Sequence, residues 1–78
     1  MQIYEFILII PDVDQETAEA IYGRCQDSSV GKSHETTYVA FDREAKSLES
    51  AISSAVDDLK KVGVQPMKVE IEVPATTI

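Results

Sequence analysis

The sequence predicts an α+β fold in which strand and helix signals follow the order β-α-β-β-α-β. The strand signals, short apolar runs or period-two alternation rich in β-branched residues, fall at residues 3–10, 28–41 and 67–73. Apolar residues recur at helical spacing over residues 14–25 and 47–62. In 78 residues this order is the ferredoxin-like, split βαβ plan, an antiparallel sheet with two helices on one face.

The first predicted strand is apolar on both faces, as expected of a central strand that is covered twice. One face carries Tyr4, Phe6, Leu8 and Ile10, and the other carries Ile3, Glu5, Ile7 and Ile9. Pro11 ends the strand because it has no N–H to give to a neighbouring strand.

The first predicted helix follows directly. Asp12 and Asp14 are both suitable N-caps, and Gly23 offers an earlier end than Cys25. Its apolar stripe is Ala18, Ile21, Tyr22 and Cys25.

A hairpin-like stretch comes next, with a brief edge strand near residues 28–32 and a clearer strand over residues 36–41. In the second strand Thr37, Val39 and Phe41 share one face, and Thr36, Tyr38 and Ala40 share the other. We expect Asp42, Arg43 and Glu44 to close this strand as a loop before the second helix. Their sign pattern also suits a local ion pair or a partner's Arg or Lys, so these three are the polar binding candidates.

The second predicted helix begins after Ser47 as N-cap and ends before Gly63. Its buried stripe is Leu48, Ile52, Ala55, Val56, Leu59 and Val62. Asp57 and Asp58 lie opposite that stripe, so we expect a solvated face.

The last predicted strand alternates strictly. We expect Met67, Val69, Ile71 and Val73 to point inward and Lys68, Glu70 and Glu72 to point outward. Pro74 ends it, which gives one domain over residues 1–74 and a loose tail over residues 75–78.

Composition excludes several classes of function. Fourteen acidic residues against seven basic ones give a net charge of −7, the wrong sign for binding phosphate backbones or an anionic membrane surface. The N-terminal residues resemble neither a signal peptide nor a membrane span, and a single cysteine fits a reducing compartment. We therefore expect a cytoplasmic protein that binds no nucleic acid directly and no membrane.

No motif predicts catalysis, a metal or a cofactor. The segment Val30-Gly31-Lys32-Ser33 ends like a phosphate-binding loop, but Gln26 stands where that loop needs glycine, so we expect a turn. His34 has no second ligand for a metal nearby, and Cys25 is expected to be buried. An acylphosphatase-type enzyme is disfavoured because the connection at residues 11–14 is acidic.

The face of the sheet away from the helices is the candidate interface. Ile7, Ile9, Tyr38 and Ala40 are predicted to lie there, and they suit contact with a second copy or another protein better than open water. Cover by loops or by the C-terminal tail is the alternative.

Residues 40–56, Ala-Phe-Asp-Arg-Glu-Ala-Lys-Ser-Leu-Glu-Ser-Ala-Ile-Ser-Ser-Ala-Val, resemble a family of small uncharacterised bacterial proteins with a Phe-Asp-Arg-Glu-Ala…Ser-Leu…Ala-Ile…Ser-Ala core. Longer members carry a C-terminal helix-turn-helix, so the resemblance implies a regulatory or antitoxin-like setting. It transfers no catalytic residue and no DNA binding to this chain.

These observations together predict a non-enzymatic binding or regulatory module that acts through protein–protein contact, in the form of a homodimer, on the open sheet face. The alternative is a small-molecule-sensing domain of the amino-acid-binding type. Pro11-Asp12 at the first strand–helix junction favours it, but the glycine usual in such loops is missing.

Overall fold

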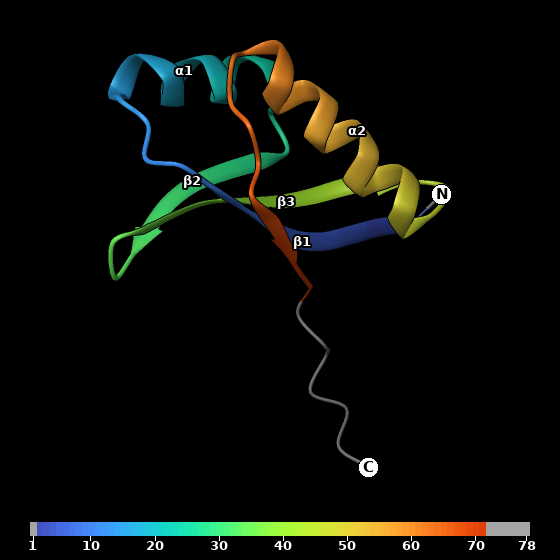
Figure 1. Ribbon diagram of the computed structural model, residues 1–78. Coiled ribbons are helices and arrows are strands. Elements are labelled where there is room, and N and C mark those ends of the chain that lie inside the picture. Colours follow the sequence, from blue (N-terminus) through green and yellow to red (C-terminus); the bar gives the residue numbers. More distant parts are fainter. Residues whose placement is uncertain (1, 72–78) are drawn as a thin grey trace.

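Both helices lie on the same face of a four-stranded antiparallel sheet (Figure 1). The computed structural model describes residues 2–71. The elements are β1 (Gln2–Ile10), α1 (Gln15–Arg24), β2 (Ser28–Ser33), β3 (Thr36–Ala45), α2 (Leu48–Lys61) and β4 (Lys68–Glu70). The strand order is β2-β3-β1-β4. This order confirms the predicted ferredoxin-like split βαβ fold.

The central strand is β1, as the sequence predicts. It pairs with β3 from Gln2 opposite Ala45 to Ile10 opposite Thr37, and it pairs with β4 on its other side. The prediction that the third strand closes at residues 42–44 is wrong, because β3 continues to Ala45. The early start of β1 provides a pairing partner for these additional residues.

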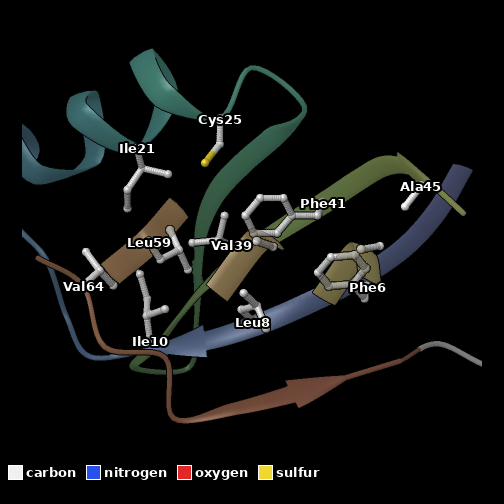
Figure 2. Packing of buried hydrophobic residues seen from close by; sticks show 12 residues of the cluster. Phe6, Leu8, Ile10, Ile21, Cys25, Val39, Phe41, Ala45, Leu59 and Val64 are labelled. Carbon is white, nitrogen blue, oxygen red and sulfur yellow. The ribbon is translucent and has the colours of Figure 1, made fainter. Parts of the chain in front are cut away.

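The core lies between the helices and the helix-covered face of the sheet (Figure 2). Phe6 and Phe41 stack there with ring centroids 5.3 Å apart. The other fully enclosed apolar residues include Leu8, Ile10, Ile21, Cys25, Val39, Ala51, Ala55, Leu59 and Val64. Burying one Leu, Ile or Phe side chain stabilises a fold by about 1.5–3 kcal/mol, so this cluster determines how the helices dock.

Polar caps set where each helix begins. The Asp14 carboxylate accepts a hydrogen bond from the Thr17 N–H at 2.8 Å, and the Ser47 hydroxyl accepts one from the Ser50 N–H at 3.1 Å. Of the two predicted N-caps for α1, Asp14 is therefore the one in use. Helix α1 continues past Gly23 and ends at Arg24.

The prediction for the last strand is wrong in extent and in burial. Strand β4 spans only Lys68–Glu70, and Met67, Val69 and Ile71 are 63%, 39% and 48% exposed. Val69 does point to the helix side, since it pairs with the core residue Leu8. It stays exposed because α2 packs on β3 and β1 and leaves β4 uncovered. The predictions for residues 72–78 lie outside the described residues.

A two-residue turn joins β2 to β3. Both of its residues, His34 and Glu35, adopt positive φ angles, of 50° and 68°. Positive φ at both central positions matches the right-handed twist of a hairpin, but it normally calls for Asn or Gly. The loop position predicted for His34 is confirmed.

Candidate functional site

The face of the sheet opposite the helices carries two contrasting halves, and we call it the open face. Directly opposite residues on neighbouring antiparallel strands point to the same side of a sheet. Ile7 opposite Ala40 and Ile9 opposite Tyr38 therefore form an apolar half. Towards the start of β1, the residue pairs Glu5–Asp42 and Ile3–Glu44 place three carboxylates on the same face.

The apolar half is hollowed. A concavity of about 690 Å³ lies between the β2–β3 turn and the start of β4. Ile7, Ile9 and Tyr38 line it, and its polar lining residues include Asp12, Ser33, His34, Glu35, Thr36, Lys68 and Glu70. A volume of this size lies within the range of small-molecule sites, about 300–1,000 Å³.

The interface candidates differ in exposure. Ile9 is only 7% exposed, although no helix covers it, whereas Ile7, Tyr38 and Ala40 are half-buried. Among these four candidates, the apolar surface available to a partner is therefore centred on Ile7 and Tyr38. Ile3, on the same face, is 66% exposed.

Tyr38 is held over the neighbouring strand by a glycine. A Cβ added at Gly31 would lie 2.5 Å from both Cζ and Oη of Tyr38. The tyrosine ring therefore occupies the space above Gly31, directly opposite it in the sheet. This close approach fixes one wall of the hollow.

The three polar binding candidates do not share a face. Asp42 and Glu44 lie exposed on the open face, whereas Arg43, between them in β3, points to the helix side. The Arg43 side chain is 12% exposed and lies over the Phe41 ring, with Cζ 5.1 Å from the ring centroid. Only Asp42 and Glu44 therefore remain available to a partner on the open face.

Arg43 is the centre of an ion-pair cluster that links three elements. It donates two hydrogen bonds to Asp27 after α1, forms a 3.0 Å ion pair with Asp58 on α2, and donates to the Ser54 hydroxyl. Asp58 also binds Arg24 of α1 at 3.2 Å. The prediction that Asp58 belongs to a solvated helix face is therefore wrong.

Electrostatics in this cluster follow from its contacts. The hydrogen bonds from Arg43 lower the pKa of Asp27 below its ordinary value, and burial raises the pKa of the Cys25 thiol, with Asp58 adding to the rise. Burial of Cys25 confirms the prediction from the sequence. A raised thiol pKa disfavours the nucleophilic thiolate.

The segment that resembles a phosphate-binding loop lies in β2, which confirms the edge strand predicted near residues 28–32, and it does not form the turn that was also expected. Val30, Gly31, Lys32 and Ser33 all lie in β2, paired with β3. Lys32 lies 3.6 Å from Asp12, and the Thr37 hydroxyl donates to the same carboxylate at 2.9 Å. The Thr37 hydrogen bond and then the charge of Lys32 lower the pKa of Asp12.

Other structural features do not assign a chemistry. Across residues 2–71, no group of three or more His, Cys, Asp or Glu residues is arranged to hold a metal ion. None of the helices in this part of the chain is long and apolar enough to cross a membrane. Comparison of the chain with protein-family models, curated proteins and solved structures finds no match. The resemblance of residues 40–56 to a bacterial family stays a prediction.

Several contacts join residues that are far apart in the sequence, and no local pattern predicts them. Nothing near Asp27 or Asp58 in the sequence signals a shared arginine on β3. Tyr22 belongs to the predicted apolar stripe of α1, yet it is 45% exposed and hydrogen-bonds Val30 on β2. No signal in the sequence around Tyr22 predicts this contact.

Proposed function

We propose that this chain is a non-enzymatic binding or regulatory module whose open face takes another protein. The partner segment is basic at one end and apolar at the other. The observation that carries the proposal is the adjacency of the apolar half, centred on Ile7 and Tyr38, with the carboxylates of Glu5, Asp42 and Glu44. Apolar contact supplies affinity, and complementary charge steers the approach and fixes the orientation.

The acidic half favours a different protein over a second copy on this face. Two open faces packed together would set carboxylates against carboxylates or bury them against Ile9 and Tyr38. The first arrangement is repulsive, and the second removes charges from water without a partner. A Lys- or Arg-bearing segment avoids both costs, and the net charge of −7 attracts it from a distance.

The test is co-purification from the native host with matched baits. The baits are the wild type, the double variant Glu5→Lys/Asp42→Lys, and a control variant with the same charge change on α1, Glu16→Lys/Glu19→Lys. We expect one protein to bind the wild type and the control and to be lost from the open-face variant. Its binding should weaken with salt, and backbone amide shifts should map it to β1 and β3. Equal capture by all three baits, or shifts confined to the helices, contradicts the proposal.

The hollow supports a second candidate function, a small-molecule-sensing domain. Its apolar floor and charged rim suit a compact ligand with both apolar and ionised groups, such as an amino acid. A thermal-shift screen against amino acids and nucleotides tests it. A stabilising ligand whose effect disappears in Ile7→Arg but persists in the Glu16→Lys/Glu19→Lys control favours this function. A screen without a stabilising compound counts against it.

A further inference from the structure

The two outer edges of the sheet differ in how they are protected. The Tyr22 hydroxyl accepts a hydrogen bond from the Val30 N–H at 3.1 Å and donates one to the Val30 carbonyl at 3.3 Å. The middle of the β2 edge is thereby closed by α1. Within residues 2–71, no strand lies beyond β4. An uncovered strand edge is a template for pairing with another chain.

The contacts of Tyr22 also fix which backbone groups β4 presents outward. Val30, Val39, Leu8 and Val69 lie opposite one another across the four strands. In antiparallel sheets, the residues along such a line turn their N–H and C=O groups alternately to one side and the other. Because Val30 points its groups outward, Val39 and Leu8 point theirs towards each other. Val69 must then point its N–H and C=O away from β1, beyond the edge.

Two other hydrogen bonds agree with this phase. The Asp42 N–H donates to the Asp27 carbonyl at 3.0 Å. Asp27 lies three residues from Val30, and Asp42 lies three residues from Val39. By alternation, the backbone groups of Asp27 and Asp42 point opposite to those of Val30 and Val39, and so towards each other. The Ile9 carbonyl, next to Leu8, faces β4, because it accepts a hydrogen bond at 2.7 Å from the N–H of Met67, the residue just before β4 begins. The outward orientation of the Val69 backbone therefore rests on contacts at both ends of the sheet.

The side chains of this edge form a self-complementary sequence. Lys68 and Glu70 lie on the open-face side of β4, with Nζ and Oε2 3.5 Å apart. Val69 lies on the helix side, and Met67 and Ile71, which flank β4 in the sequence, have exposed side chains. Read in either direction from Val69, the order is a charged residue and then an apolar one, and the two charges have opposite sign.

We propose that a second copy of this chain pairs with β4 edge to edge, antiparallel, about a two-fold axis at Val69. The two Val69 residues then exchange two backbone hydrogen bonds. Lys68 of each copy then lies opposite Glu70 of the other. The two sheets become one eight-stranded sheet with all helices on the same side. This interface is separate from the open face, and it goes beyond the proposed function.

Charge selects this register over its neighbours. A two-fold axis at Lys68 would place the two lysines directly opposite each other, and an axis at Glu70 would do the same with two glutamates. Like charges directly opposite on paired strands destabilise the pairing, whereas opposite charges stabilise it. The contact is short, since β4 has three residues, so we expect a weak dimer that dissociates on dilution.

Sedimentation equilibrium across micromolar to millimolar concentrations tests the proposal. We expect the mass to rise from 8.6 kDa towards twice that value. Lys68→Glu and Glu70→Lys should each weaken the dimer by roughly tenfold, because each sets like charges opposite each other twice. An equimolar mixture of these two variants should associate again, since all four charges then meet opposite ones. The double variant Lys68→Glu/Glu70→Lys should associate like the wild type.

The variants also separate this contact from general charge effects. Glu70→Lys lowers the net negative charge of the chain, so relief of overall repulsion would strengthen association, whereas the proposal requires it to weaken. Val69→Pro removes the outward N–H without removing a hydrogen bond to β1, so it should abolish the dimer and leave the fold intact. Circular dichroism and thermal unfolding confirm that each variant is folded.

Three results would overturn the proposal. The first is a wild type that stays monomeric at millimolar concentration. The second is a dimer that neither charge variant weakens. The third is a dimer lost in Ile7→Lys but retained in Val69→Pro, because that result moves self-association to the open face. The first two results leave co-purification through the open face unaffected. The third bears on both proposals, and its dependence on Ile7 distinguishes it from the other two.

Discussion

The guanidinium of Arg43 binds the Asp27 carboxylate through two hydrogen bonds, from Nε to Oδ2 at 2.8 Å and from Nη2 to Oδ1 at 3.1 Å. This forked contact joins the centre of the sheet to the connection that follows α1. Two further charges, Asp58 and Arg24, extend it to both helices. The cluster therefore fixes the helix layer on one face of the sheet and leaves the other face uncovered by helices (Figure 1).

Arg43→Lys should destabilise the fold. A lysine keeps the charge but cannot reproduce the paired contact with Asp27 or lie flat over Phe41, so we expect a loss of about 2 kcal/mol in the free energy of unfolding. Urea unfolding followed by circular dichroism measures it. Lys46→Arg, an exposed change of the same residue types, is the control and should change stability by less than about 0.5 kcal/mol. Equal urea midpoints of unfolding for Arg43→Lys and Lys46→Arg would contradict a structural role for Arg43.

Asp27→Asn should make the free energy of unfolding depend less on pH in the acidic range. Because Arg43 lowers the pKa of Asp27 in the folded state, the ionised carboxylate contributes stability above the unfolded pKa, and that contribution is lost as the pH falls through the folded pKa. We therefore expect the variant to be less stable than the wild type at pH 7. The difference should shrink below a pH of about 4, near the ordinary carboxyl pKa.

Thermal unfolding from pH 7 to pH 2 measures this difference. Asp57→Asn, on the exposed face of α2, serves as the control for removing one negative charge. A gap between wild type and Asp27→Asn that stays constant over the whole pH range would show that Asp27 acts through its shape and not its charge.

Gly31→Ala should displace the Tyr38 ring. The new methyl group would meet Cζ and Oη of Tyr38 at 2.5 Å, and the ring can rotate away only by leaving the wall of the hollow. We expect a loss of about 1 kcal/mol and shifted Tyr38 ring resonances. In a Tyr38→Ala background the same change should be neutral or stabilising, because alanine is favoured over glycine in a strand by roughly 0.5–1 kcal/mol. Additive effects of the two changes would rule out this contact.

The turn between β2 and β3 should gain stability from residues that accept positive φ. Replacing His34-Glu35 by Asn-Gly relieves two left-handed residues, each costing about 1 kcal/mol, and we expect a gain of roughly 1–2 kcal/mol. Gly63→Ala makes the converse change, because it removes a glycine from a position with a φ of +83°. The added methyl group would meet no neighbouring atom, so the expected loss of about 1 kcal/mol comes from the backbone alone. Chemical denaturation compares both with the wild type. A destabilised Asn-Gly variant would show that His34 or Glu35 makes a contact more valuable than the strain.

The local signals of the chain determined most of its architecture. A short apolar run placed β1, and β-branched and aromatic residues placed the start of β3. Helical spacing placed α1 and α2, with Ser47 expected to begin one helix and Asp12 or Asp14 the other. These features depend on neighbours within a few residues, and for that reason composition and spacing reveal them. The two faces of β1 also followed from alternation alone, including the position of Ile7 and Ile9 away from the helices.

Tertiary structure decided which of these residues are covered and which charges meet. Met67, Val69 and Ile71 alternate like a buried strand, yet α2 lies over β3 and β1 and does not reach them. Ile9 lacks a covering helix but is buried by its neighbours. Arg43 pairs with Asp27 and Asp58 only because β3, α2 and the connection after α1 lie close together in the fold. Such contacts join residues far apart in the chain, so no local pattern encodes them, and the exposure of Met67, Val69 and Ile71 follows only from where α2 docks.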